Sequence, residues 1–407
     1  MKNICIDLGA SSTRVTGENG IIHELPNYLI FKDRTDVVDL DTARDAEDKL
    51  NDFLGNLDVV VEKTTGAPCK AFPARALVGE LATRCSATVN RPSVMMNKSR
   101  QNINLFNILV AAMQQCYTYG YDGSPITLYI AFPPLEVTKD VKDEINQSLV
   151  GTYAAKIDKL DLNLTLNIGE VKVFPEAYMA LAAFFFNFPS CTLRKEIEEK
   201  YGKGHIMGLD IGASTTDIAV ALNRKLLEKS GQTIKTGCNV IEMDIANSIR
   251  SKYGYDPTHE DLTTAICEGR LPMGNGYVDV SDMLRRAKQE FARTIVAELQ
   301  NYFRLVNIPL QSIRAIMVCG GGSLPSGYFE NEQFVQTCAC VGDFITKELN
   351  NVVENIDVIT MEDPRTANTR GLFVRMMMEK AAAEAQAKKA AETQATAAEA
   401  AVANATI

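Results

Sequence analysis

The sequence lacks the signatures that define several common classes of enzyme. With three histidines and no Gly-x-Ser-x-Gly elbow, it gives poor support to a Ser-His-Asp hydrolase. The absence of a Gly-x-x-x-x-Gly-Lys-[Ser/Thr] loop excludes a P-loop nucleoside triphosphatase. The chain also has no Cys-x-x-Cys pair and no His-Glu-x-x-His helix, which are common ligand patterns of zinc proteins. Any catalytic site must therefore use other residue types.

Features of secreted and membrane proteins are also missing. The ten cysteines are scattered, and the closest pair, Cys338 and Cys340, lacks matching His or Cys partners, so we expect free thiols. The chain opens directly on an apolar strand, and we expect no secretory signal. The most apolar segment, 177–188, is too short to cross a bilayer. A net charge of −9 argues against a broad nucleic-acid-binding surface. We therefore expect a cytoplasmic protein without direct membrane or nucleic-acid contacts.

The composition is that of an ordinary soluble protein with a large core. Of the 407 residues, 46% are hydrophobic and 23% are charged, and this length favours two or more domains. The last segment differs, because fourteen of the final 28 residues are Ala. Such a stretch has high helix propensity but little apolar surface to bury. We expect 381–407 to be a frayed helix or a flexible tail outside any catalytic core.

One short motif occurs twice in the chain. Residues 4–15 read Ile-Cys-Ile-Asp-Leu-Gly-Ala-Ser-Ser-Thr-Arg-Val, and residues 208–220 read Gly-Leu-Asp-Ile-Gly-Ala-Ser-Thr-Thr-Asp-Ile-Ala-Val. Each copy predicts a strand, a tight turn and a second strand. The copies align Asp7 with Asp210, Gly9 with Gly212, Ser11 with Ser214 and Thr13 with Thr216. Two near-identical copies half a chain apart predict two similar halves that face one ligand.

The residue types in this motif suit a metal-bound phosphate. Gly leaves room for an approaching phosphate, and turn amides and hydroxyls can bond its oxygens. An Asp at a strand end suits a hydrated Mg²⁺, so Asp7 and Asp210 are candidates to hold one through water. The candidate phosphate ligands are Gly9, Ala10, Ser11, Ser12, Thr13, Gly212, Ala213, Ser214, Thr215, Thr216 and Asp217. The alternative role is strand-end capping for each Asp, and anchoring of its own turn for Asp217. Arg14 occupies the position equivalent to Asp217 in the first copy.

Two further features could complete such a site. Glu176 lies at a predicted strand-to-helix junction, where ligands bind in α/β folds, and it could orient or deprotonate a water. An acid that simply favours the first turn of a helix explains it equally well. The run 320–323, Gly-Gly-Gly-Ser, follows a predicted buried strand. Because it lacks bulky side chains, it favours close contact with a ring or a ribose, with a flexible turn as the alternative.

Hydrophobic periodicity predicts the main elements of both halves. The predicted strands outside the two motifs are 59–61, 76–78, 126–132, 171–174 and 315–319. The predicted helices are 104–117, 139–150, 177–188, 244–252 and 283–305. The charged segment 193–203 is interpreted as the bridge between the halves. The stretch 24–124 is less regular, and we interpret it as a variable insertion carried on the first half.

The order of these motifs resembles that of the actin, heat-shock-chaperone and sugar-kinase ATPase superfamily. Its first phosphate motif matches 7–13, its second matches 210–217, its connecting motif matches 175–177 and its adenosine motif matches 318–323. Within the superfamily, the chain is most similar to bacterial actin-like proteins of the ParM/StbA/Alp type. The segment 363–373 resembles the Ala-Asn-x-Arg-Gly-Phe/Tyr signature near the end of those proteins.

This resemblance implies a fold and a division of the chain. The fold would be a duplicated, actin-like (ribonuclease H-like) α/β ATPase with a nucleotide cleft between two domains. Domain I would span 1–192, including the insertion 24–124, and a helix over 366–380 would complete it. Domain II would span 204–365, and 381–407 would be the Ala-rich tail.

The resemblance also implies roles for single residues and a cofactor. Asp7 and Asp210 would hold Mg²⁺ through water, and Glu176 would position the water that attacks the terminal phosphate of ATP or GTP. The nucleoside side of the cleft would be lined by Gly237, Gly320, Gly321, Gly322 and Ser323.

Three functions stay open at this point. The leading hypothesis is a filament-forming ATPase that polymerises head to tail and segregates plasmid or phage DNA through a DNA-binding adaptor. A small-molecule kinase on the same fold is the second, although no Asp has a persuasive context as the base for an acceptor hydroxyl. A non-filamentous scaffold that binds nucleotide without turnover is the third.

Overall fold

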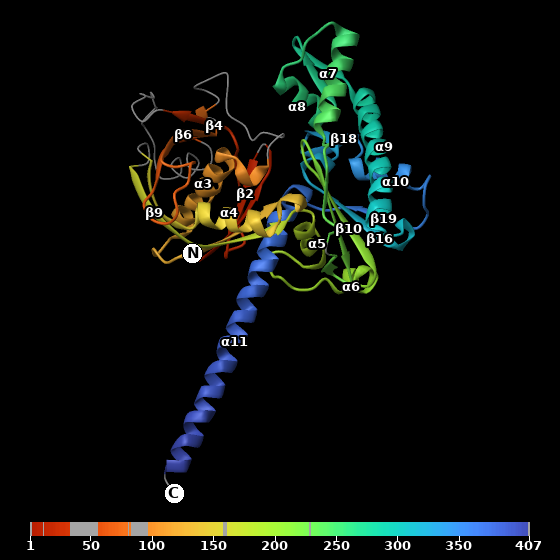
Figure 1. Cartoon of the computed structure of the whole chain (residues 1–407). Coiled ribbons are helices and arrows are strands. Elements are labelled where there is room, and N and C mark those ends of the chain that lie inside the picture. The colour runs from red at the N-terminus through yellow and green to blue at the C-terminus, as the bar shows by residue number, and fades with distance from the viewer. Residues whose placement is uncertain are drawn as a thin grey trace.

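The chain folds into two lobes, each built on its own β-sheet (Figure 1). The computed structural model describes residues 2–10, 12–32, 56–79, 81–82, 97–157, 161–227 and 229–405. None of the helices in these ranges combines the length and the apolar character that crossing a membrane requires. The observed architecture is thus a mixed α/β fold in two parts.

The first lobe holds a nine-stranded sheet in the order β3-β2-β1-β7-β9-β8-β5-β6-β4. Its strands are β1 (Asn3–Leu8), β2 (Ser12–Gly17), β3 (Ile22–Pro26), β4 (Leu29–Lys32), β5 (Asn56–Lys63), β6 (Ala74–Gly79), β7 (Ile126–Phe132), β8 (Gly151–Ile157) and β9 (Leu162–Pro175). β1 and β2 form an antiparallel hairpin with Asp7 opposite Arg14, and β1 pairs in parallel with β7. The described part of 24–124 contributes β4, β5 and β6 to this sheet.

Alternate residues of the first sheet face different helices, because successive side chains in a strand point to opposite faces. Ile4 and Ile6 of β1 join the core formed with α3 (Asn102–Tyr119) and α4 (Lys139–Leu149). Cys5 lies between them in sequence and packs instead with residues of α11 (Ala367–Ala405). The sheet is therefore covered by helices on both faces.

The second lobe repeats the hairpin of the first lobe in a smaller sheet, ordered β12-β11-β10-β16-β19, with β13 paired to β11. Its strands are β10 (His205–Ile211), β11 (Thr216–Leu222), β12 (Lys225–Leu226), β13 (Gln232–Ile234), β16 (Ile313–Cys319) and β19 (Asp357–Thr360). β10 and β11 are antiparallel with Asp210 opposite Asp217, and β10 pairs in parallel with β16. The duplication read in the sequence is thus present in the strand pairing.

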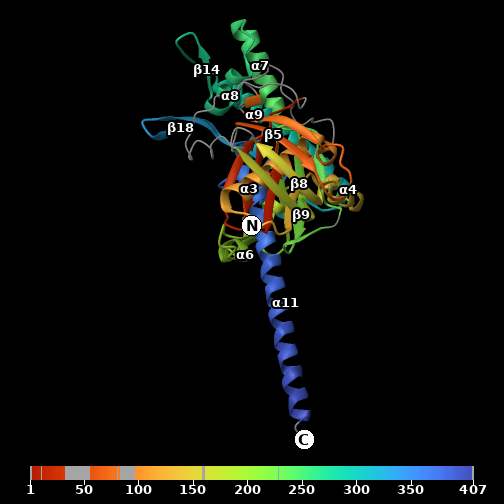
Figure 2. The ribbon, with the colours of Figure 1, turned by 90° about the vertical axis from the view of Figure 1, so that its left-hand side faces the viewer.

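Helices and two small hairpins surround the second sheet. The helices are α7 (Asn239–Tyr253), α8 (His259–Glu268), α9 (Ser281–Val306) and α10 (Val341–Leu349), and they share one core with the sheet. The hairpins are formed by β14 (Arg270–Met273) with β15 (Gly276–Asp279), and by β17 (Ser326–Glu330) with β18 (Gln333–Cys338). Figure 2 shows both hairpins projecting from the body.

Two helices connect the lobes. α5 (Tyr178–Phe185) packs Leu181 and Phe185 on the second sheet, whereas its Met179 packs with α11 and the first sheet. Gly371 allows α11 to approach α5 closely, because a Cβ atom there would lie 1.7 Å from the carbonyl oxygen of Met179. Farther along, α11 leaves the body as a single extended helix (Figure 2), and the side chains of 381–393 are exposed.

Most predicted elements are present, with shifted ends. The predicted strand 126–132 is confirmed as β7. Apart from 171–174 and 177–188, each of the other predicted strands and helices corresponds to one observed element. The predicted strand 171–174 was too short, since β9 begins at Leu162 and pairs along its first half with β8. The predicted helix 177–188 was too long, because Phe186 leaves the helix and forms a β-bridge with Leu193. The segment 195–201 forms the short helix α6 (Lys195–Tyr201).

Candidate functional site

The ends of β1 and β10 bring Asp7 and Asp210 into one electrostatic environment. Both carboxyls are buried, with 5% and 8% of their surface exposed. The pKa of Asp7 is raised to about 6, mainly by burial; Arg14 opposes this rise and the neighbouring Asp210 adds to it. Burial also raises the pKa of Asp210. The two copies of the motif therefore meet at one place between the lobes.

Asn368 at the start of α11 links this pair to the strand-to-helix junction. Its Nδ2 donates to Oδ2 of Asp210 at 2.6 Å, and its Oδ1 accepts from the backbone N–H of Ala177 at 3.2 Å. No role was predicted for Asn368 from the sequence, although it lies in the segment 363–373 that carries the family resemblance. One buried amide thus connects β10, α11 and the junction that holds Glu176.

Glu176 lies at the junction after β9 and is 3% exposed. Its N–H donates to the carbonyl of Phe132 at 2.8 Å, which holds it beside the end of β7. Ala177 next to it has φ +58 and ψ −42, and the N–H of Tyr178 donates to the carbonyl of Glu176 at 2.5 Å. This is a γ-turn in the rare, strained form. Strain of this kind is concentrated at functional sites.

Lys98 faces Glu176 and was not predicted from the sequence. Its Nζ donates to Oε1 of Glu176 at 2.8 Å and to the carbonyl of Leu8 at 2.9 Å. Burial raises the pKa of Glu176 well above its ordinary value, and Lys98 opposes this shift. Burial lowers the pKa of Lys98, but Glu176 and Asp217 more than offset this effect, so its pKa stays above the usual range. Lys98 is therefore a fixed cation among several carboxyls.

The turn between β1 and β2 is closed by its own backbone and by one asparagine. The N–H of Gly9 donates to the carbonyl of Ser12 at 2.9 Å. Asn27 donates to the carbonyl of Gly9 at 2.6 Å and accepts from Oγ1 of Thr13 at 2.5 Å. Ala10 lies in this turn, whereas the predicted residue Ser11 falls outside the residues that the structure describes. The described turn is rigid and lies next to Asp7.

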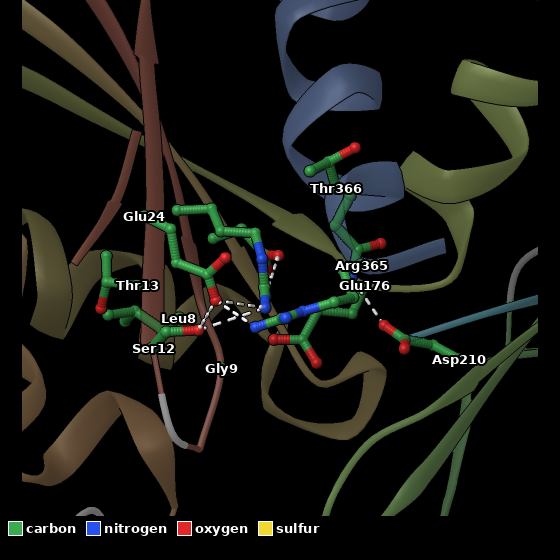
Figure 3. A network of polar contacts seen from close by, with 12 residues as sticks. Leu8, Gly9, Ser12, Thr13, Glu24, Glu176, Asp210, Arg365 and Thr366 are labelled. Carbon is green, nitrogen blue, oxygen red and sulfur yellow. Dashed lines mark hydrogen bonds and ion pairs between the residues drawn. The ribbon is translucent and has the colours of Figure 1, made fainter. Parts of the chain in front are cut away.

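Glu24 connects Ser12 of the same turn with Arg365 (Figure 3). Arg14 belongs to the same network. Its NH2 donates to Glu24 and to Oγ of Ser12, each at 3.1 Å, while its NH1 lies 3.8 Å from Oδ2 of Asp7. Arg365, just before α11, forms a second ion pair with Glu24. Arg14 Nε is buried and has no hydrogen-bond partner among the described residues. The Nε–H of Arg14 can therefore still donate a hydrogen bond to a further anion.

The turn between β10 and β11 has the same backbone bond as the first turn. The N–H of Gly212 donates to the carbonyl of Thr215 at 2.9 Å. The first amides of α7 then hold the turn, because Cys238 and Asn239 donate to the carbonyls of Gly212 and Ala213 at 3.0 and 2.7 Å. A Cβ atom on Gly237 would lie 2.5 Å from the nitrogen of Ser214. Gly237 is therefore required by this close packing.

Several hydroxyl and acidic side chains of the second motif form hydrogen bonds within the protein. Thr216 donates to the carbonyl of Thr236 at 2.7 Å. Asp217 accepts from Thr233 at 2.5 Å and from Thr215 at 3.4 Å, and burial raises its pKa to about 6. These bonds agree with the turn-anchoring role considered for Asp217. Its carboxyl also belongs to the cluster that interacts with Lys98.

The glycine run packs directly against Asp210. Gly320 has φ +86, and a Cβ atom on it would lie 2.3 Å from Oδ1 of Asp210. A Cβ atom on Gly322 would lie 2.7 Å from Ile211 Cγ2 and 2.9 Å from Cys238 Cβ. Ser323 is fully buried and donates to the carbonyl of Gly320 at 2.7 Å. The run therefore lies between the second motif and the start of α7.

The residues present fit a Mg²⁺-bound nucleotide. Four buried carboxyls, of Asp7, Glu176, Asp210 and Asp217, outnumber the two cations of Lys98 and Arg14. A divalent cation would oppose the rise in pKa that burial, and to a lesser extent the neighbouring carboxyls, produce. Among the described residues, no group of three or more His, Cys, Asp or Glu side chains could hold a metal alone. This agrees with Mg²⁺, which commonly keeps waters and phosphate as ligands.

Comparisons with known proteins identify the class of this fold. The family model "Archaeal actin homologue MreB-like, C-terminal" matches residues 208–327. The chain is similar to a solved 15-stranded ParM filament from Clostridium botulinum, with 17% identity, a TM-score of 0.63, and coverage of 92% of this chain and 98% of that one. No curated protein sequence matches. The chain has the actin-like fold, which confirms the fold predicted from the motifs.

Two other solved structures have the same fold. The actin-like protein Alp7A is 18% identical, with a TM-score of 0.68 and coverage of 96% of this chain and 99% of that one. The archaeal actin homolog Ta0583 in complex with ADP is 14% identical, with a TM-score of 0.61 and coverage of 93% and 100%. The chain thus shares the actin-like fold of ParM, Alp7A and the archaeal homolog, which agrees with the resemblance of segment 363–373 to bacterial actin-like proteins.

Proposed function

We propose that the chain is a filament-forming actin-like ATPase that binds ATP or GTP with Mg²⁺ between its lobes. The observation that carries this proposal is the convergence of both duplicated turns, Glu176 and Lys98 on one buried acidic cluster. The similarity to a ParM filament and to an ADP complex of an actin homolog supports it.

In this proposal the two turns grip the phosphates. Asp7 and Asp210 would hold a hydrated Mg²⁺, which would neutralise phosphate charge. The turns 9–13 and 212–217 supply amides and hydroxyls, and Arg14 supplies a cation. The nucleoside lies along Gly237 and 320–323, glycine-rich segments that pack closely on the second motif and whose lack of side chains lets a ligand approach the backbone.

Glu176 acts on the attacking water. A carboxylate must be ionised to accept a proton, whereas burial favours its neutral form. Lys98, 2.8 Å away, favours the ionised form and fixes its direction. We assign Lys98 to the positioning of Glu176, and Glu176 to the orientation or deprotonation of water.

Nucleotide state controls assembly through the two lobes. Two nucleotide states that favour different lobe closures shift the population that fits a filament. Head-to-tail contacts use two different patches on each subunit and give open filaments. We propose a cytoplasmic filament that moves plasmid or phage DNA through a DNA-binding adaptor, in line with the ParM-type relatives.

A light-scattering and phosphate-release experiment tests this function. Purified protein with Mg²⁺ and ATP or GTP should scatter light above a critical concentration, and phosphate should appear afterwards. Electron microscopy of the same samples should show filaments. The variant Asp210→Asn serves as a control that loses metal-nucleotide binding. Absence of assembly under every nucleotide, salt and crowding condition would remove the proposal.

A further inference from the structure

The hairpin of β17 and β18, residues 326–338, exposes large aromatic side chains. Phe329 is 75% exposed and Phe334 is 46% exposed, and their ring centroids lie 5.4 Å apart. Glu330 and Glu332 at its tip are exposed as well. An exposed apolar cluster rimmed by charge marks an interaction site. We call residues 326–338 the aromatic hairpin.

The base of the aromatic hairpin is fixed to the second lobe. The buried Nζ of Lys288 donates to Oγ of Ser326 at 2.9 Å and to the carbonyl of Ala339 at 3.0 Å. Thr337 donates to the carbonyl of Glu268 at 2.8 Å. The guanidinium of Arg270 lies 3.5 Å from the ring centroid of Tyr328. The tip of the aromatic hairpin is therefore held on a fixed base, which lowers the entropic cost of binding.

An apolar cavity of about 430 Å³ lies between α5, α11 and the ends of both sheets. Its walls include Phe174, Tyr178 and Phe185, and the exposed Met378 of α11 stands at its edge. This volume falls in the range of roughly 300–1,000 Å³ that is usual for binding pockets. Figure 1 shows α5 at the lower end of the body, well away from β18. The cavity and the aromatic hairpin therefore cannot meet within one molecule.

The charges of the two surfaces are complementary. Three cations, Lys142, Arg224 and Arg375, line the cavity, and no acidic side chain lines its described part. Arg224 and Arg375 also pair with Glu198 and Glu379, whereas Lys142 has no ion pair among the described residues. The hairpin tip carries the opposite charge beside its aromatic rings.

We propose that the aromatic hairpin of one subunit inserts into this cavity of a second copy of the chain. Phe329 and Phe334 fill the apolar part, while Glu330 and Glu332 face the cationic edge. This contact joins two different patches, so it can repeat from one subunit to the next, and it gives an open filament when the rotation between subunits does not close a ring. The inference rests on the proposed filament function and names one of its interfaces.

Two surface variants that complement each other test the contact. The hairpin variant carries Phe329→Ser and Phe334→Ser, and the cavity variant carries Lys142→Glu and Met378→Glu. Each variant keeps the patch that the other has lost. Circular dichroism and thermal melts establish that both are folded. Leu305→Ser, at a residue that is 82% exposed on α9, is the matched control and should assemble like the parent.

Each variant alone should assemble at least tenfold less readily than the parent, measured as critical concentration. An equimolar mixture should give 1:1 complexes in sedimentation equilibrium, because one intact hairpin meets one intact cavity. Assembly of both variants at the parental critical concentration would overturn the inference and leave the filament function standing. Loss of assembly in the cavity variant alone would also overturn it, since another segment would then fill the cavity.

The mixture also separates the inference from the proposed function. If the parent fails to assemble with any nucleotide, the filament function fails, and the mixture still decides the contact at the highest soluble concentration. A mixture that stays monomeric there removes the contact. A 1:1 complex supports it without any filament.

Discussion

At the scale of single residues, the proposed hydrolysis of nucleotide depends on the ion pair between Lys98 and Glu176. Glu176→Gln keeps the shape of the side chain and removes its charge. We expect assembly with nucleotide to persist and phosphate release to slow by about 100-fold or more, because general-base catalysis is typically worth that much. Timed phosphate release and filament lifetime measure both effects. Glu170→Gln, on the exposed side of β9, is the matched control. Release at the parental rate in Glu176→Gln would refute its role on water.

Lys98 compensates several buried carboxyls, so its removal should affect folding as well. Lys98→Met leaves Glu176 and its neighbours without their cation, and breaking such a pair costs on the order of 3 kcal/mol. We expect a lower midpoint in urea at pH 7, and a partial recovery in the double variant Lys98→Met/Glu176→Gln. A double variant as unstable as the sum of both singles would contradict the pairing.

The same residues show what sequence could and could not supply. That Asp7 and Asp210 lie near each other was predictable because the motif is duplicated. That Glu176 joins them was predictable because it follows a strand and precedes a helix. Lys98 was not predictable, since it lies 78 positions from Glu176 in a segment without periodicity. Asn368 sits 158 positions from Asp210, and its role needs the fold that brings α11 beside β10.

At the scale of elements, the glycine run offers a sharp contrast between neighbours. Gly320→Ala would place a Cβ atom 2.3 Å from Asp210 in a left-handed conformation, whereas Gly321→Ala would meet nothing closer than 4.0 Å. We expect Gly320→Ala to lose roughly 1–3 kcal/mol of stability and to weaken nucleotide binding. Gly321→Ala should stay near the parent. Calorimetry and fluorescent-nucleotide titration measure the two effects, and equal behaviour of the variants would contradict this geometry.

The extension of α11 should be dispensable for folding. Its side chains over 381–393 are exposed, whereas Leu372, Phe373 and Met376 are buried. A chain that ends at Lys380 should unfold within about 0.5 kcal/mol of the parent, because exposed positions contribute little. A chain that ends at Gly371 loses the buried residues and should not fold. Thermal melts of the parent and the two shortened chains decide this. A marked loss of stability in the chain that ends at Lys380 would show that 381–405 packs on the body.

The strand β9 and the helix α9 show how far periodicity predicts the ends of an element. Residues 162–168 alternate Leu-Asn-Leu-Thr-Leu-Asn-Ile, a period of two that indicates a strand, and β9 begins there. The predicted start at 171 missed this alternation. By contrast, the helical face of 283–305 is long enough to define α9 almost to its ends. Both segments therefore carried a periodic signal in the sequence, whereas the pairing of β9 with β8 depends on the fold.

At the scale of the whole molecule, the duplication predicts two related lobes but not their arrangement. The lobes are held by α5 and α11, which come from different parts of the chain, and by the bond from Asn368 to Asp210. The resemblance of the motifs supplied this arrangement in advance, and periodicity alone did not. The cavity between α5 and α11 is a consequence of the same arrangement and had no signal in the sequence.

The buried acidic cluster gives the nucleotide-free protein an unusual dependence on pH. The pKa values of Asp7 and Asp217 are raised to about 6 by burial, and those of Asp210 and Glu176 are raised in the same direction. Between about pH 4 and pH 6 the folded chain binds protons that the unfolded chain has released, so stability falls as pH rises through this window. His23 acts in the opposite sense, since burial lowers its pKa. Carboxyls with a lowered pKa, such as that of the exposed Glu24, also act in the opposite sense, but mainly below about pH 5, where unfolded carboxyls titrate.

The melting temperature without nucleotide should therefore be several degrees higher at pH 5 than at pH 7. Asp7→Asn/Asp217→Asn removes two of the four groups and should flatten this dependence. Added Mg²⁺ and nucleotide should flatten it as well, because the cation favours the ionised carboxylates. Melting scans across this pH range, with and without Mg²⁺ and nucleotide, measure each effect. A melting temperature that rises from pH 5 to pH 7 in the nucleotide-free parent would mean that the carboxyls are already ionised, and the cleft would then hold less unfavourable charge for a metal to relieve.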